Sequence, residues 1–146
     1  MEASILHERG HTQQAVTLLE QAIALDPKAT EPYYRLGLIY ADMKDYEKAI
    51  TYLQKVVEIN PRYTNAYLNL GSAFGYLKQY DVALRCFLKA LSLDTRNPKT
   101  YYNLGLTYWV LRDGKKAGLF LSKARQLCIE QKDTVLLEKI DKLYQK

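Results

Sequence analysis

The sequence predicts an all-α fold in which antiparallel helix pairs are stacked one on another. The main observation is a frame of small, aromatic and leucine residues that recurs at intervals of 34 residues. The frame consists of Gly37, Gly71 and Gly105, of Ala49, Ala83 and Ala117, of Leu36, Leu70 and Leu104, and of Tyr33, Tyr67 and Tyr101. A repeat of this length indicates supersecondary units that stack, because one unit alone cannot bury its apolar face.

Each repeat has the spacing of two helices. In the segment that begins at Thr30, apolar or small residues recur every three or four positions on both sides of a break at 43–45. Asp45 stands where it can cap the second helix. A glycine inside a helix costs about 1 kcal/mol relative to alanine. The recurring glycine therefore predicts a close approach of the two helices, with the recurring alanine as its small partner.

The helices are predicted in chain order from this pattern. Four pairs are expected, at 1–9 with 12–25, 30–43 with 46–59, 64–77 with 80–93, and 98–111 with 114–129. Pro98 suits the first turn of its helix, where no backbone donor is lost. A further amphipathic helix over 134–145 has Leu136 and Ile140 on its apolar side and does not follow the frame. It is expected to cap the array and shield the last repeat from water.

The frame resembles the tetratricopeptide repeat. Its signature is an aromatic residue, Leu-Gly and a second aromatic residue, as in Tyr33-x2-Leu36-Gly37-x2-Tyr40, followed by alanines and an Asp/Asn-Pro pair. The resemblance covers roughly residues 1–131 and implies a right-handed superhelical solenoid of antiparallel helix pairs. The sequence departs from the pattern at Val56, Thr95 and Gly114, which replace alanine, proline and an aromatic residue.

The resemblance divides the single domain 1–146 into repeats. They are an incomplete repeat one (1–29), repeat two (30–63), repeat three (64–97), repeat four (98–131) and the capping helix (132–146). The first helix of repeat one lacks about five residues and its aromatic anchor. Two interpretations stay open: a natural short first helix, or a fragment of a longer array.

Composition favours a globular, cytoplasmic protein. Apolar residues make up 48% and charged residues 25% of the chain, which is typical of a folded domain. No apolar run approaches a membrane span, and Met1–Gly10 lacks a signal-peptide core, so no membrane partner is expected. Cys86 and Cys128 are too few for a disulfide framework and are expected to be reduced, buried thiols.

Charge is distributed unevenly along the chain. Residues 1–60 carry 6 basic and 9 acidic side chains, residues 61–111 carry 6 and 2, and residues 112–146 carry 9 and 5, which gives −3, +4 and +4. The basic half could attract an acidic peptide or a nucleic acid, or it could simply be a solvated surface. Nucleic acid is disfavoured, because basic residues do not alternate with a stacking platform.

The segment His7-Glu8-Arg9-Gly10-His11 matches H-E-x-x-H, the pattern of zinc metalloproteases. Zinc binding of this kind requires both histidines on one continuous helix. Here Gly10 and His11 fall at the predicted turn between two helices, and the chain has no third histidine. No metal, no cofactor and no catalytic residue is therefore expected, and the chain is not expected to be an enzyme.

The first helices carry an unusual second apolar stripe. Opposite their core positions, where polar residues are expected, they have aromatic and aliphatic residues. The resemblance implies that first helices line a concave groove that binds a peptide or a helix. The candidate groove residues are Tyr34, Leu38, Leu68, Asn69, Tyr76, Lys99, Tyr102, Asn103, Leu106 and Trp109. Packing against neighbouring first helices or the capping helix is the alternative for this stripe.

One subtype of this family binds the C-terminal carboxylate of heat-shock chaperones through Lys, Arg and Asn side chains at five repeat positions. Repeats two to four place Tyr34, Leu38, Asn69, Lys99 and Asn103 there, so two of the five match. The chain is therefore not expected to be a chaperone clamp. The sequence favours a non-catalytic scaffold for a protein or peptide. A self-assembling module and a regulatory fragment of a larger protein remain as alternatives.

We expect self-association through the N-terminal edge, or exchange of the first helix between copies. A predicted helix of under ten residues is marginal on its own, and it leaves apolar residues of the helix at 12–25 poorly covered. Sedimentation at rising protein concentration should show oligomers, and a polar capping helix added before Glu2 should shift them to monomer. A monomer at high micromolar concentration would contradict this expectation.

Overall fold

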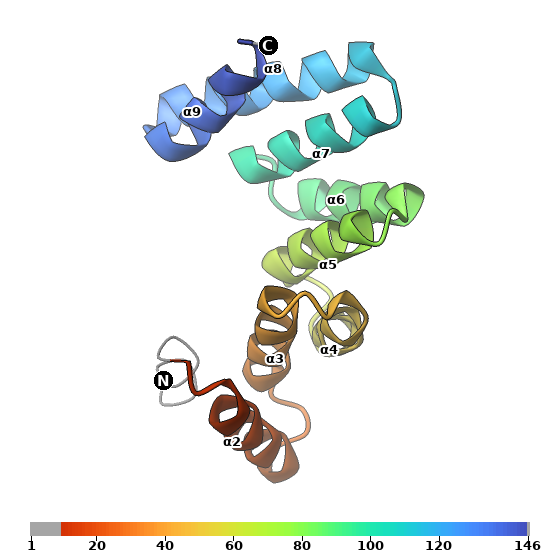
Figure 1. Ribbon diagram of the computed structural model, residues 1–146, viewed down its shortest axis with the longest axis vertical. Coiled ribbons are helices and arrows are strands. Elements are labelled where there is room, and N and C mark those ends of the chain that lie inside the picture. The colour runs from red at the N-terminus through yellow and green to blue at the C-terminus, as the bar shows by residue number, and fades with distance from the viewer. Residues whose placement is uncertain (1–9, 146) are drawn as a thin grey trace.

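A computed structural model describes residues 10–145 of the chain, and in this range every regular element is an α-helix. The helices are α2 (Thr12–Leu25), α3 (Thr30–Asp42), α4 (Tyr46–Ile59), α5 (Thr64–Tyr76), α6 (Tyr80–Leu93), α7 (Pro98–Val110), α8 (Gly114–Gln131) and α9 (Thr134–Leu143). They follow one another in a single stack from α2 to α8, with α9 at the far end (Figure 1). The helix predicted at 1–9 lies outside the described residues. The predicted all-α solenoid of helix pairs is confirmed.

Helix bounds agree closely with the prediction, with small differences at the C-terminal ends. The helices α3, α5 and α7 end one residue early, because the next residue is already the C-cap. The helix α8 continues to Gln131, two residues beyond the expected end, and α9 ends at Leu143. Asp45 caps α4 as predicted, since its carboxylate accepts a hydrogen bond from the Lys48 N–H at 3.3 Å.

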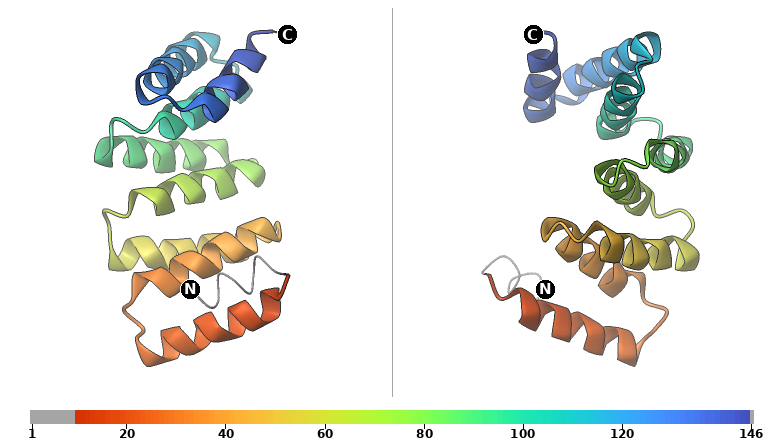
Figure 2. Two further views of the ribbon diagram at one scale, coloured as in Figure 1. Left: turned by 90° about the vertical axis from the view of Figure 1, so that its left-hand side faces the viewer. Right: turned by 45° about the vertical axis from the view of Figure 1, so that its right-hand side comes forward.

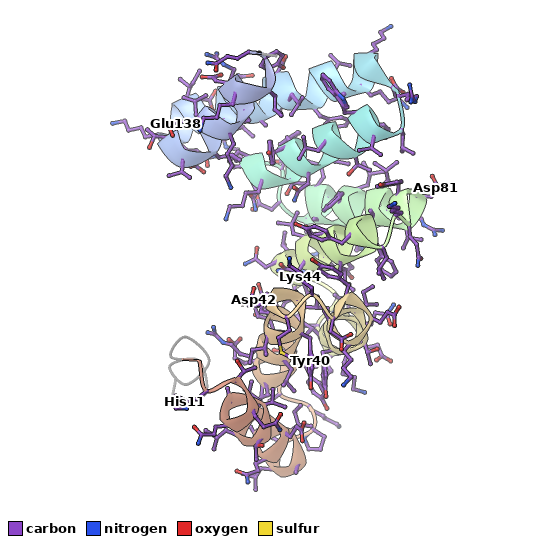
Figure 3. The ribbon with its side chains drawn as sticks, viewed as in Figure 1. His11, Tyr40, Asp42, Lys44, Asp81 and Glu138 are labelled. Atoms are coloured by element: carbon purple, nitrogen blue, oxygen red, sulfur yellow. The ribbon has the colours of Figure 1, made fainter. Side chains whose placement is uncertain are left out.

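The turn inside each pair is closed by a left-handed residue. Lys44, Lys78 and Arg112 have φ between 62° and 64°, and the residue after each donates its N–H to the carbonyl five positions back along the chain. One such bond joins the Asp45 N–H to the Tyr40 carbonyl at 2.9 Å. This is the Schellman ending of a helix, usually made by glycine. Figure 3 shows Lys44 at this turn.

The turn between pairs explains the recurring tyrosine. The Tyr33 hydroxyl donates to the Pro27 carbonyl at 2.9 Å. Its counterparts Tyr67 and Tyr101 donate to the same position of the next two turns, at 3.0 and 2.9 Å. Each turn also contains an Asx hydrogen bond, such as the Arg62 N–H to the Asn60 carboxamide. The frame tyrosines therefore tie each first helix to the turn that precedes it.

The frame glycines allow the two helices of a pair to interlock. A Cβ atom added to Gly37 or Gly105 would lie 2.6 Å from the Cγ atom of Leu53 or Leu121. At Gly71 it would collide with the ring of Phe87. The predicted close approach is confirmed, but the expected partner needs correction: the nearest atoms belong to large side chains one turn beyond the frame alanines. The alanines contribute backbone oxygens at Gly37 and Gly105.

The pairs form two layers, and the buried side chains of the described residues group into clusters along the stack. The first helices α3, α5 and α7 contact one another in sequence, and the second helices α4 and α6 each pack between two first helices. Figure 2 shows the pairs stacked along the long axis. The side chains of Leu36, Leu53, Leu104 and Leu121 are fully buried between the layers. Burial of this kind is the main stabilising term in a repeat array.

The last helix covers the end of the stack only in part. In α9, Leu136 and Ile140 are buried against Ala124 and Cys128 of α8. The carboxylate of Asp141 accepts a hydrogen bond from the Arg125 Nε–H at 2.8 Å. Burial raises the pKa of the Cys128 thiol, and the pKa of the half-buried Cys86 thiol rises for the same reason. Both thiols are free.

Two glycine substitutions should have opposite effects on stability. Gly71→Ala forces a Cβ atom against the Phe87 ring and should destabilise the protein by about 1–3 kcal/mol. Gly118→Ala, in the second turn of α8 where an added Cβ atom has no neighbour within 4 Å, should stabilise it by about 0.5–1 kcal/mol. Urea unfolding measures both. An equal effect of the two substitutions would contradict the interlock.

Candidate functional site

The outward side of the first helices divides into two halves with different chemistry. Between α3 and α5 the side chains satisfy one another. Glu31 is the centre of this half: its carboxylate pairs with Arg35 at 2.9 Å and accepts the Tyr63 hydroxyl at 3.3 Å. The ring of Tyr63 in turn packs against Tyr34, with centroids 4.9 Å apart. This half is a closed polar network.

Asn69 belongs to the same network. Its amide nitrogen donates to the Tyr34 hydroxyl at 3.1 Å and to the Asn65 carbonyl at 2.8 Å. Both amide protons are therefore used within the protein, and only the carboxamide oxygen is left for a ligand. Burial raises the pKa of Tyr34. The pKa of Tyr63 is raised to about 12, first by burial and then by the neighbouring Glu31 charge.

Between α5 and α7 the surface is open. A hollow of about 340 Å³ lies there, which we call the α5/α7 hollow. Its lining residues are Gly71, Ser72, Gly75, Tyr76, Tyr80, Phe87, Asn103, Leu106, Thr107 and Val110. A Cβ atom at Gly75 would have no neighbour within 4 Å. The absence of a side chain at Gly75 keeps this part of the surface hollow.

One wall of the α5/α7 hollow is held by stacked aromatic rings. Tyr76 is 67% exposed, yet its ring lies parallel to that of Tyr46 from the preceding pair, with centroids 4.6 Å apart. Such stacking contributes about 0.5–1.5 kcal/mol beyond burial. Sequence reasoning singled out Tyr76 but missed Tyr46 as its support and Tyr80 in the lining. Their 34-residue spacing is the signal that could have found them.

Several predicted groove residues lie elsewhere. Leu68 is only 7% exposed and packs in the core with Phe87 and Leu104, so the expectation that it lines an open groove is wrong. Side chains of α6 and Leu104 of α7 cover this position. Tyr102 is half-buried and packs against the cluster formed with α9. Leu38 is half-buried and Lys99 is exposed.

Trp109 lies at a separate place. Its side chain is 61% exposed, so it is a surface residue. It lines a second open hollow of about 520 Å³, which we call the end hollow, together with Val110, Arg112 and Gly114. Trp109 therefore does not line the α5/α7 hollow. In the frame it occupies the position that Gly75 occupies one repeat earlier.

The H-E-x-x-H segment does not continue as a helix. Gly10 has φ +84°, in the left-handed region, and His11 is the N-cap of α2. Figure 3 shows His11 at the N-terminal end of α2. His7 and Glu8 lie outside the described residues. In the part of the chain that the structure describes, no cluster of His, Cys, Asp and Glu could hold a metal ion. Nor does any helix within 10–145 have the length and apolarity to span a membrane.

Comparisons with known proteins give one family. A family model described as tetratricopeptide repeat matches residues 30–63, and one described as TPR repeat matches residues 3–44 and 76–111. A search of curated proteins found no significant match.

Solved structures of MamA proteins have a similar fold. MamA from Desulfovibrio magneticus RS-1 is 29% identical, with a TM-score of 0.81 over 88% of this chain and 73% of that one. A structure described as MamA MSR-1 is 28% identical, with a TM-score of 0.76 over 86% and 72%. Another MamA structure covers 98% of this chain and 90% of its own at 23% identity, with a TM-score of 0.80. The last likeness shows the fold alone.

The pKa of Tyr63 offers a test of the closed network. The folded-state pKa of Tyr63, about 12, exceeds the unfolded value of about 10. The contribution of Tyr63 to the free energy of unfolding is therefore fully present below pH 10. This contribution is lost as the pH rises through 12. Glu31→Gln should lower the pKa of Tyr63, measured by NMR of ring-labelled tyrosine with Tyr63→Phe for assignment.

The matched control for this titration is Glu47→Gln, which removes an exposed carboxylate in α4. This substitution should leave the pKa of Tyr63 where it is. An equal fall in both variants would show that the Glu31 contact does not set the pKa.

Proposed function

We propose that the chain binds a peptide segment of a partner protein in the α5/α7 hollow. The chain belongs to the tetratricopeptide repeat family, whose arrays are protein-interaction scaffolds. The observation that carries the proposal is the contrast between the two halves of the surface. Side chains satisfy one another between α3 and α5, whereas an open hollow with an uncommitted amide lies between α5 and α7.

The size and lining of the hollow favour a bulky apolar anchor. Its volume of about 340 Å³ is at the lower end of ligand sites, which span roughly 300–1,000 Å³. Gly75 forms an open floor, while Leu106 and the ring of Tyr76 provide apolar walls. A single aromatic or large aliphatic side chain of the peptide fits this space. An anchor of this kind supplies most of the binding energy in a small interface.

Asn103 is suited to bind the peptide main chain. Asn103 occupies the frame position that Asn69 has one repeat earlier. Asn69 donates a hydrogen bond to the hydroxyl of Tyr34. The residue equivalent to Tyr34 for Asn103 is Leu68, which has no hydroxyl. Among the described residues, no group accepts or donates a hydrogen bond to the Asn103 side chain, whereas its backbone carbonyl accepts the Thr107 hydroxyl at 2.7 Å. A carboxamide can donate to a peptide carbonyl and accept from a peptide N–H, which fixes the peptide direction.

Self-assembly is the second candidate function, in which a segment of another copy occupies the same hollow. The exposed side chain of Leu25, 88% exposed at the C-terminal end of α2, favours an apolar contact near the N-terminal edge. The two candidates differ in concentration dependence. A scaffold for another protein stays monomeric without its partner, whereas a self-assembling module associates as its own concentration rises.

Binding can be tested with peptides selected from a displayed random library and measured by fluorescence anisotropy. Gly75→Leu fills the hollow and should weaken binding about tenfold or more. Asn103→Ala removes one hydrogen-bonding group and should weaken it by about 0.5–1.5 kcal/mol. The matched control is Gly118→Leu, a glycine-to-leucine change in α8 outside the hollow.

Peptides that bind Gly75→Leu as tightly as the unchanged protein would contradict the proposal. Selected peptides without a bulky apolar residue would contradict it as well. Unfolding of Gly75→Leu is checked by circular dichroism, and Gly75→Ala provides a smaller change at the same position. Gly75→Ala should raise stability by up to about 1 kcal/mol while it narrows the hollow only slightly.

A further inference from the structure

Each second helix has a face that receives the next pair. In α4 this face consists of Tyr46, Ile50 and Val57, which pack against α5. In α6 the same frame positions hold Tyr80, Leu84 and Leu91, and Leu84 and Leu91 pack against the cluster that contains Leu104 of α7. In α8 they hold Gly114, Gly118 and Arg125. The last pair therefore lacks the large apolar side chains with which the earlier pairs bind the following helix.

The capping helix does not cover this face completely. The contacts of α9 lie on the C-terminal half of α8, at Ala124 and Cys128, and Arg125 is held by Asp141. At the other half, a Cβ atom added to Gly114 or Gly118 would have no neighbour within 4 Å. Figure 1 shows α9 beside the left-hand part of α8, away from the end where α7 turns into α8. The N-terminal half of α8 is left uncovered.

Trp109 points to the same place. Its frame counterpart Gly75 lines the space between α5 and the next first helix, α7. Trp109 stands 34 residues after Gly75, so it faces the space beside α7 in which a following first helix would lie. In that space it lines the end hollow. Val110 beside it is 51% exposed. A neighbouring tryptophan and valine exposed in this way form an apolar patch with the composition of a binding site.

The charge around this patch is positive. Arg112 lines the end hollow, and Lys115, which follows the lining residue Gly114 in the sequence, is exposed. Asp113 lies between them in the sequence and is the N-cap of α8, where its carboxylate accepts the Lys116 N–H at 3.1 Å. The Lys116 ammonium lies over the Tyr108 ring at 5.3 Å, within cation–π range. Residues 112–146 carry 9 basic and 5 acidic side chains, a net +4, so an acidic partner is favoured electrostatically.

We propose that this end of the array binds an acidic amphipathic helix of a partner protein. The binding surface, called the end surface, consists of Trp109, Val110, Arg112, Gly114, Lys115 and Gly118. The occupant is a helix because the equivalent faces of α4 and α6 are covered by the helices α5 and α7. Gly114 and Gly118 allow that helix to approach closely. A large aromatic residue of the partner fills the end hollow beside Gly114. In the two earlier pairs, the frame position of Gly114 is occupied by Tyr46 and Tyr80.

Of its residues, this surface shares Val110 with the lining of the α5/α7 hollow, and a direct optical signal reports on it. Trp109 is the only tryptophan of the chain. Burial of Trp109 under a tryptophan-free helix should shift its fluorescence to shorter wavelength. The probe is a displayed library of tryptophan-free amphipathic peptides about four turns long, with randomised charge on the flanks of the apolar face and an aromatic residue at its centre.

The selected peptides should be rich in Asp and Glu and should cause the fluorescence shift. Gly118→Leu, which places a side chain on the open face, should weaken binding by about tenfold or more. The double substitution Arg112→Glu with Lys115→Glu should weaken it to a similar degree and reverse its salt dependence. Gly75→Leu is the matched control and should leave this binding unchanged.

Trp109→Ala, measured by anisotropy with labelled peptide, should lose binding while its thermal midpoint stays within about 3 °C of the parent. The inference is overturned if the library yields no peptide that shifts the fluorescence, or if the enriched peptides are basic. Binding that survives Gly118→Leu, or is lost in Gly75→Leu, would also overturn it. A fluorescence shift that follows the concentration of the protein alone would assign the surface to a second copy instead.

Discussion

The structure depends on the interlock between the two helices of each pair. A glycine of the first helix receives a large side chain of the second, as Gly71 receives Phe87. Any side chain at the glycine would push the helices apart, so this contact sets their distance. The left-handed turn and the tyrosine bond to the preceding turn then set the direction in which the next pair begins. With these three contacts repeated, the backbone of one pair closely resembles that of the next.

A uniform backbone leaves function to the residues outside the frame. The side chain of Asn69 in α5 donates a hydrogen bond to the hydroxyl of Tyr34 in α3. One repeat later the equivalent positions hold Leu68 and Asn103, and no such bond forms. The same scaffold thus supports a closed polar network in one place and an open hollow in the next. The chemistry of each interval between first helices is decided by one or two side chains.

The sequence predicted the fold well because the frame acts locally. Helix spacing, the Asp45 cap and the recurring glycine each depend on residues of one pair, and the helix bounds agreed within two residues. The candidate site was predicted less well, because it depends on how neighbouring pairs pack against one another. Leu68 has the spacing of a groove residue but is buried against α6. The hydrogen bond from the Asn69 amide to the hydroxyl of Tyr34, 35 residues away, follows only from the placement of α3 beside α5.

The glycines separate into two classes on physical grounds, and this separation favours the two surfaces proposed for binding. Gly37, Gly71 and Gly105 cannot be replaced without a collision, so packing accounts for them. A Cβ atom added to Gly75, Gly114 or Gly118 would have nothing within 4 Å. Gly118 lies inside α8, where glycine costs up to about 1 kcal/mol relative to alanine, whereas Gly114 is the first residue of that helix. Packing within the chain does not explain these three. They border the α5/α7 hollow or the end surface, where the missing side chains leave room for another molecule.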